Sequence, residues 1–253
     1  MSPRRSSAGT LLWLWNSLAL KVLAPRPSVL SLVAMTQFKK LRTAILISGR
    51  GSNMMSLVEA ARAPGYSAQI VTVISNRPDA AGLAWAKSQG ISTLAIDHKT
   101  FTSRGAFEAE LQKALQAANA ELVALAGFMR LMTPDFVGQW HNRMINIHPS
   151  LLPSFKGLDT HERALAAGVK VTGCTVHFVR AELDSGPIIA QAAVPVHSGD
   201  TADILAARVL AAEHRVYPHA VDLLGSGRVH IQGEKMTIIE EVNRESWLFS
   251  PAL

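Results

Sequence analysis

The chain has 253 residues, of which 48% are hydrophobic, and it contains a single cysteine, Cys174. One cysteine excludes an internal disulfide framework and a cysteine-based zinc site, so we expect a reducing, cytoplasmic compartment. The formal net charge of +6 is uneven, because residues 1–58 hold eight Lys or Arg and no acidic residue, while the remainder holds 17 basic and 19 acidic residues. This balance argues against nucleic-acid binding by the main body of the chain.

The first 34 residues differ from the rest of the chain. The apolar run LLWLWNSLAL follows two arginines, as in a targeting segment, but the Pro25–Pro27 break stops it below the roughly 18 to 20 apolar residues of a membrane span. Three interpretations stay open, namely a translation start placed upstream of Met35, organelle targeting and a structured role. We expect residues 1–34 to be a disordered leader or an upstream-start artefact, and residues 35–253 to form a single domain.

From residue 43 onward, short β-rich runs alternate with helical stretches. The apolar runs predict strands at 43–48, 68–75, 91–96, 121–127 and 143–147. Helices are predicted between them at 54–63 and 84–87, and after Ser103, a residue type that caps helices well. In this last helix the apolar side chains recur at helical spacing, at Phe107, Leu111, Leu115 and Ala118. Such a repeat of strand, helix and strand predicts a doubly wound α/β fold with a mostly parallel sheet.

The pattern changes after residue 160. Two further strands are predicted at 173–179 and 187–196, with no helix between them, followed by a helix at 202–224. The segment RVHIQGEKMTII at 228–239 predicts a closing hairpin around Gly233. We therefore expect one α/β domain with a small C-terminal β extension.

The segment GRGSN, residues 49–53, joins the first predicted strand to the first helix. Backbone N–H groups and the helix dipole hold phosphates at such a position. A dinucleotide-binding loop needs a third glycine three positions after Gly51, where Met54 stands. Ser52 and Asn53 add side-chain donors, which suits a single terminal phosphate. A plain tight turn is the alternative.

Asn146 and His148 lie two residues apart in the segment MINIHPSLLPSFKG. Residues at this spacing face the same side of a strand, and Pro149 ends the strand directly after His148. Ligands bind at the carboxyl ends of strands in open parallel sheets, where the GRGSN loop also opens. An amide stabilises an oxyanion and an imidazole moves protons near neutral pH, so the pair suits acyl transfer. Two hydrogen-bonded polar groups at a strand end are the alternative.

Five segments together resemble the phosphoribosylglycinamide formyltransferase family: ISGRGSN, LAGFMRLM, NIHPSLLPSFKG, THERAL and HFVRAELDSGPIIAQ. The resemblance spans roughly residues 41–230, in the family's order. Members of this family pass the formyl group of 10-formyltetrahydrofolate to the amine of glycinamide ribonucleotide in purine synthesis. The resemblance therefore implies a Rossmann-like formyltransferase fold, these two small molecules as substrates, no metal, and a monomer or homodimer without nucleic-acid or membrane partners.

The resemblance also implies roles for individual residues. The implied catalytic residues are Asn146, His148 and Asp184, of which Asp184 orients the histidine and a water. The implied ribonucleotide-binding residues are Gly51, Ser52, Asn53 and Glu213. The implied folate-binding residues are Arg104, Met129, Arg130, Leu131, Met132, Asn146, Arg180, Ala181, Glu182, Leu183 and Asp184. A cis peptide bond between Leu152 and Pro153 is implied as well.

Some positions depart from the family or have a plainer interpretation. Leu210 stands where a relative of the family has a polar substrate contact, and Asp159 where a relative carries histidine. Neither position belongs to the catalytic set, so we expect an effect on substrate affinity alone. His177 alternates with apolar neighbours and reads as a hydrogen-bonded strand residue, and His161 reads as support for a turn. The Met129–Met132 run can equally be core.

Four other functions make different demands on the chain. A methionyl-tRNA formyltransferase would need a second, basic domain after this one. A formyltetrahydrofolate deformylase would need a regulatory domain in front of it. A nucleotide-dependent oxidoreductase would need the third glycine that Met54 replaces. A non-catalytic folate- or phosphate-binding protein would not need the Asn146, His148 and Asp184 set.

Overall fold

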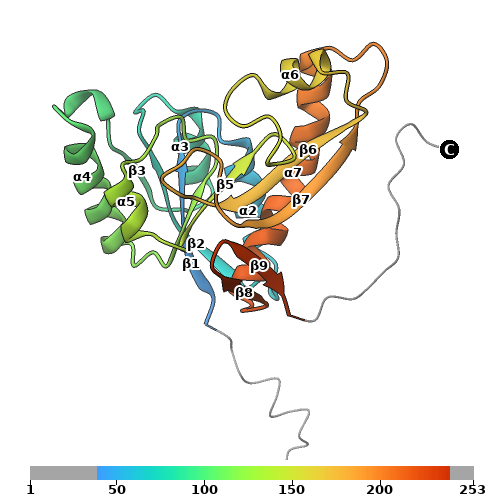
Figure 1. Ribbon diagram of the computed structural model, residues 1–253. Coiled ribbons are helices and arrows are strands. Elements are labelled where there is room, and N and C mark those ends of the chain that lie inside the picture. The colour runs from blue at the N-terminus through green and yellow to red at the C-terminus, as the bar shows by residue number, and fades with distance from the viewer. Residues whose placement is uncertain (1–38, 240–253) are drawn as a thin grey trace, which may run out of the picture. The chain divides into compact units, whose positions relative to one another are not determined.

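The structure is a computed structural model that describes residues 39–239, so the predictions about residues 1–34 and a start at Met35 lie outside the described residues. A seven-stranded sheet with the strand order β3-β2-β1-β4-β5-β6-β7 carries the fold (Figure 1). The strands are β1 (Leu41–Ile47), β2 (Ala68–Ser75), β3 (Thr93–Ala95), β4 (Leu122–Leu125), β5 (Met144–His148), β6 (Val171–Phe178) and β7 (Ile188–Pro195).

The first five strands are parallel, whereas β6 runs antiparallel to both β5 and β7. The chain builds outward from β1 to β3 and then returns to add β4 on the other side of β1, so the sheet is doubly wound as predicted. Short strands β8 (Val229–Gln232) and β9 (Lys235–Ile238) form the predicted hairpin, in which Gly233 has a positive φ of 58°.

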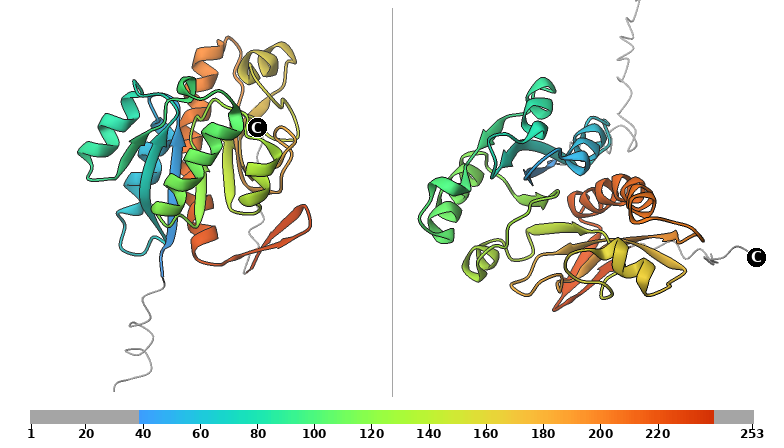
Figure 2. Two further views of the ribbon diagram at one scale, coloured as in Figure 1. Left: turned by 90° about the vertical axis from the view of Figure 1, so that its left-hand side faces the viewer. Right: turned by 90° about the horizontal axis from the view of Figure 1, so that it is seen from above.

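Helices cover both faces of the sheet (Figure 2). They are α2 (Ser52–Ala61), α3 (Ala81–Ser88), α4 (Arg104–Ala117), α5 (Pro134–Gln139), α6 (Thr160–Ala166), α7 (Ala202–Gly225) and the 3-10 helix η1 (His98–Thr100). The Ser103 side chain accepts a hydrogen bond from the Ala106 amide, so the predicted cap of α4 is confirmed. Within residues 39–239, no helix combines the length and the apolar character needed to cross a membrane.

Alternate residues of β1 enter two separate hydrophobic cores. Ile45 and Ile47 pack with α2 and α7 on one face, while Ala44 and Leu46 pack with α4 and α5 on the other. All four are fully buried, because a strand in the middle of a sheet covered on both faces has no side open to water. Burying a side chain such as Ile or Leu contributes about 1.5–3 kcal/mol relative to leaving it exposed.

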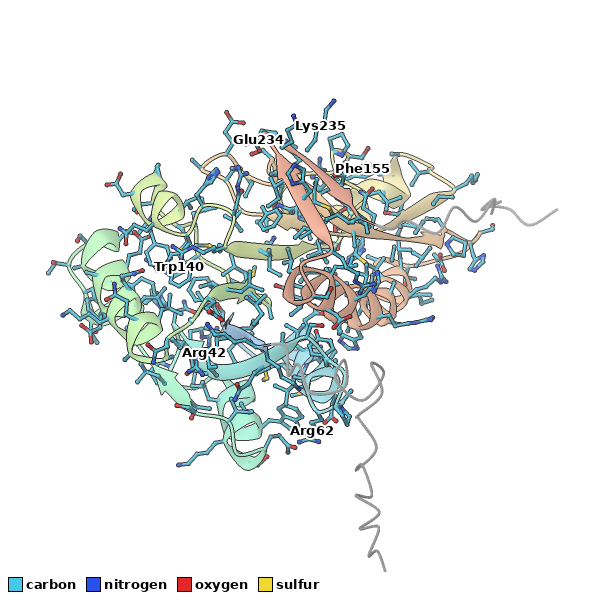
Figure 3. All side chains as sticks on the ribbon, turned by 90° about the horizontal axis from the view of Figure 1, so that it is seen from below. Arg42, Arg62, Trp140, Phe155, Glu234 and Lys235 are labelled. Atoms are coloured by element: carbon cyan, nitrogen blue, oxygen red, sulfur yellow. The ribbon has the colours of Figure 1, made fainter. Side chains whose placement is uncertain are left out.

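Helices α5 and α6 were not predicted. A signal existed for α5, because Thr133 accepts a hydrogen bond from the Phe136 amide and Pro134 occupies the first turn. The Trp140 indole that follows α5 donates to Gln112 of α4 at 2.8 Å, which holds the two helices together (Figure 3). Asp159 is the N-cap residue of α6, a position that favours aspartate, but it adopts a left-handed conformation and its side chain makes no cap hydrogen bond.

Candidate active site

The GRGSN loop leaves β1 and opens α2 at the carboxyl edge of the sheet. Gly51 precedes the helix with a φ of 71°, a left-handed conformation that glycine adopts without strain. The loop is held from α3, where the Gly82 amide donates to the Gly49 carbonyl at 3.1 Å. A Cβ atom at Gly82 would lie 2.9 Å from the Arg50 carbonyl oxygen, so only glycine allows this approach. The first N–H groups of α2 have no acceptors within the helix and face the site.

Asn53 and Glu213 meet across 160 residues of sequence. The Asn53 Nδ2 atom donates to Glu213 Oε2 at 2.6 Å, and both side chains are buried. Burial raises the pKa of Glu213, and the Asn53 hydrogen bond opposes that shift. The Asn53 Oδ1 atom is buried without a partner among the described residues. Helix α7 is positioned here by Tyr217, whose fully buried hydroxyl donates to the Leu125 carbonyl at the end of β4 at 2.9 Å.

Two adjoining cavities lie over this edge of the sheet. One has a volume of about 550 Å³, lies over the GRGSN loop, and includes the basic side chains of Arg50, Arg77, His98 and Arg130 in its lining. The other has a volume of about 760 Å³ and is lined by residues from β5, α6, α7 and the loop after β6. Asn53, Gly127, Met129 and Arg130 line both cavities. One continuous cleft therefore joins a basic end to a larger end.

Asn146 and His148 project into the larger end of the cleft, as their spacing predicted. Asp184 reaches the same point from the loop after β6, with its Oδ2 atom 3.4 Å from His148 Nδ1. The Gly157 amide donates to that oxygen at 2.9 Å, and Asp184 itself adopts a left-handed φ of 46°. His148 Nε2 lies 3.1 Å from the Phe155 carbonyl oxygen. Both ring nitrogens thus face acceptor oxygens.

His177 is a site residue that the sequence interpretation took for a plain strand residue. It pairs with Asn146 across β5 and β6, and only 2% of it is exposed. Its Nε2 atom lies 3.4 Å from Asn146 Nδ2 and 3.7 Å from Asp184 Oδ1. Alternation within TVHFV indicated its face on the strand, but only the register between β5 and β6 places it beside Asn146.

The loop that follows His148 is anchored to β6 and β7 by two residues that the sequence interpretation missed. The Thr175 hydroxyl donates to the Ser150 carbonyl at 2.7 Å and accepts from the Leu152 amide at 3.0 Å. Gln191 Nε2 donates to the same hydroxyl at 2.9 Å. The peptide bond from Leu152 to Pro153 is cis, so that prediction is confirmed.

Apolar side chains surround the mouth of the cleft and remain open to solvent. The exposed fractions are 71% for Met129, 62% for Leu131, 71% for Leu158 and 53% for Leu183. Of the run 129–132, only Met132 packs against the core. Such a patch around a cavity indicates a surface for a flat apolar ligand rather than core packing.

Arg130 follows Met129 and lies at the junction of the two cavities. Its guanidinium carbon lies 5.2 Å from the centre of the Phe107 ring. Its Nε atom is buried without a hydrogen-bond partner among the described residues. A donor of this kind is satisfied when an acceptor on a bound ligand reaches it.

The structure does not bring every predicted residue into the cleft. Arg104 is exposed at the first turn of α4 and does not line either cavity. The Arg180 guanidinium donates to Asn142 at 2.8 Å and to Glu234 of the β8–β9 hairpin at 3.0 Å, away from the cleft (Figure 3 labels Glu234). Ala181 and Glu182 are exposed and do not line the cavity, whereas Leu183 and Asp184 of the same loop do.

Of the other positions singled out in the sequence, two line the larger cavity and one does not. Asp159 and His161 line the larger cavity, and burial lowers the pKa of His161. Leu210 lies half-buried on α7, three residues before Glu213, and does not line it.

Comparison with known proteins gives consistent matches. Residues 41–221 match the formyl transferase family. The trifunctional purine biosynthetic protein adenosine-3 of Bos taurus is 50% identical over 77% of this chain, but the chain spans only 19% of the bovine protein's length. The phosphoribosylglycinamide formyltransferase of Escherichia coli strain K12 is 43% identical over 73% of this chain and 87% of its own. The crystal structure of glycinamide ribonucleotide transformylase 1 from Symbiobacterium toebii superposes with a TM-score of 0.77 at 47% identity, covering 79% of this chain and 95% of that one.

Proposed function

The chain belongs to the formyl transferase family, and on this premise we propose that it is a phosphoribosylglycinamide formyltransferase. It transfers the formyl group of 10-formyltetrahydrofolate to the amine of glycinamide ribonucleotide, giving formylglycinamide ribonucleotide and tetrahydrofolate in purine biosynthesis. The observation that carries the proposal is a single cleft that joins the GRGSN loop and Glu213 to Asn146, His148 and Asp184.

The two ends of the cleft suit the two substrates. The basic end, with the free N–H groups of α2, suits the phosphate of the ribonucleotide. Glu213 suits the hydroxyl and amine groups of the same molecule, since a carboxylate accepts several hydrogen bonds. The apolar side chains of Met129, Leu131 and Leu183 suit the flat pterin and benzoyl rings of the folate. Arg130, at the junction of the cavities, offers a buried donor to an acceptor of either ligand.

The chemistry needs one oxyanion to be stabilised and one proton to be moved. The amine nitrogen forms a bond to the formyl carbon, and the oxygen of the tetrahedral intermediate takes the negative charge. The Asn146 amide donates to that oxygen, a contact for which removal of one donor typically costs about 10² to 10³ in rate. The intermediate then collapses by breaking the bond between the formyl carbon and N10 of the folate.

His148 and Asp184 serve the proton exchange. The attacking amine loses a proton and N10 gains one before it leaves, and an imidazole catalyses such transfers for about 10² to 10⁴ in rate. Asp184 fixes the His148 ring through Nδ1 and stabilises its cationic form at 3.4 Å. We also propose a cytoplasmic location and a monomer or homodimer that needs no metal for this reaction.

A formyl-transfer assay with three acceptors tests the function. Purified full-length protein is given 10-formyltetrahydrofolate with glycinamide ribonucleotide, with methionyl-tRNA, or with buffer alone. We expect tetrahydrofolate and formylglycinamide ribonucleotide in equal amounts, and turnover only with the ribonucleotide. Equal folate release in buffer alone would identify a deformylase, and no release with any acceptor would leave a binding protein.

A further inference from the structure

His177 has no role in the transfer derived so far, although it touches two residues that do. It lies on β6 directly opposite Asn146 of β5, and its ring is almost wholly buried. Its Nδ1 atom lies 2.9 Å from the carbonyl oxygen of the next residue, Phe178. A carbonyl oxygen only accepts, so Nδ1 carries the proton and Nε2 of the neutral ring is an acceptor.

This tautomer determines which way the Asn146 amide points. The atom that faces His177 Nε2, at 3.4 Å, is Asn146 Nδ2. An acceptor on the ring requires the amide nitrogen at that place, because the amide oxygen would repel the Nε2 lone pair. The Phe178 carbonyl therefore sets the orientation of the Asn146 amide through two hydrogen bonds, one to His177 Nδ1 and one between His177 Nε2 and Asn146 Nδ2. One N–H of Nδ2 points at His177, and the second is left for a ligand in the cleft that Asn146 lines.

The charged groups around His177 favour the neutral ring on balance. Burial is the largest cause that lowers the pKa of His177, and its electrostatic interactions with His148 and Lys156 act in the same direction. The Phe178 carbonyl and the Asp184 carboxylate act in the opposite direction. Asp184 lies nearer to His148, at 3.4 Å, than to His177, at 3.7 Å, so the carboxylate serves His148 as its counter-ion.

We propose that His177 is a positioning residue, whose neutral Nδ1-protonated ring holds the Asn146 amide with an N–H directed at the formyl oxygen. This inference rests on the proposed function. A second proton on His177 would make Nε2 a donor and turn the Asn146 oxygen toward the ring. The amide would then present its oxygen in place of the donor that the oxyanion needs.

The substitution His177→Phe removes the acceptor and keeps an aromatic ring. We expect kcat to fall by about 10² and both KM values to stay within about two-fold, because the contact acts on the transition state. In an Asn146→Ala background the same substitution should cost less than about three-fold, since its effect passes through the amide. The control Thr172→Val changes another buried side chain of β6 and should leave turnover unchanged. Losses that multiply in the double variant would overturn the proposal.

A measurement on the unaltered protein keeps the proposal falsifiable if His177→Phe does not fold. In ¹⁵N NMR spectra of histidine-labelled full-length protein near neutral pH, His177 should appear neutral with its proton on Nδ1. A charged ring, or a neutral ring with its proton on Nε2, would refute the inference. This readout needs no turnover, so it separates failure of the inference from failure of the proposed formyl transfer.

Discussion

Replacing Asp184 by asparagine tests the centre of the proposed mechanism. The change removes a charge but little volume, at a side chain that is 7% exposed. Asparagine adopts the left-handed backbone conformation of residue 184 readily, and its amide oxygen can still accept from the Gly157 amide. We therefore expect Asp184→Asn to fold normally and to bind both substrates.

The size of the effect follows from one distance. Asp184 Oδ2 lies 3.4 Å from His148 Nδ1, and two unit charges at that separation attract by about 5 kcal/mol at an effective dielectric of 20. Losing this attraction when the His148 cation forms in the transition state corresponds to about 10³- to 10⁴-fold in rate. The Asp→Asn change in the Ser-His-Asp triad costs about 10⁴. We expect kcat of Asp184→Asn to fall by about 10³, with KM values within about three-fold.

Steady-state kinetics with both substrates varied measures kcat and the two KM values, and thermal unfolding checks that each variant folds. The matched variants are His148→Ala and the double variant with Asp184→Asn. Because the two residues act as a unit, the double variant should be at most about ten-fold slower than His148→Ala alone. Turnover near that of the unaltered protein in Asp184→Asn would leave the aspartate a turn residue. Two losses that multiply would mean that it acts on something other than His148.

Three further outcomes are expected. Ser52→Ala and Asn53→Ala should raise KM for the ribonucleotide, with each lost bond to the phosphate costing about 1.5–3 kcal/mol, and leave KM for the folate nearly constant; equal weakening of both would contradict the phosphate assignment. Burial raises the pKa of Glu213 above its usual 4.5. As pH rises past 4.5, this carboxyl ionises in the unfolded chain before it does in the folded protein, so the fold loses stability between pH 4.5 and the raised pKa. Glu213→Gln should therefore raise Tm at neutral pH, by about 2–4 °C per kcal/mol, and weaken ribonucleotide binding; a calorimetric gain that persists well below pH 4.5 would be inconsistent. A chain that begins at Met35 should keep full turnover, because both cavities lie within residues 39–239; loss of soluble protein or activity would show that the leader matters.

Much of the fold could be predicted because the signals are local. The continuous apolar run of β1 and the helical spacing of Phe107, Leu111 and Leu115 are patterns that each segment carries by itself. The same applies to the end of β5, where Pro149 follows His148 and the spacing of two places Asn146 on the same face. The glycine loop is local as well, since Gly51 has the positive φ that a turn into α2 requires.

The features that could not be predicted from the sequence depend on which distant segments come into contact. Nothing within α7 indicates that Glu213 accepts a hydrogen bond from Asn53, because α7 and the GRGSN loop come together only through the winding of the sheet. His177 is opposite Asn146 only in the register that β5 and β6 adopt, and a shift of one residue would turn it to the other face. Arg180 turns to Glu234 because the β8–β9 hairpin lies within its reach.

Residue types and their local periods therefore determined the elements, the strand end and the amide–imidazole pair of this protein. Tertiary structure decided strand order, pairing register and the partner of each buried polar group. The physical reason is that a backbone conformation is selected by neighbours a few residues away. A buried donor or acceptor must instead find its partner among all segments that packing brings within about 3 Å.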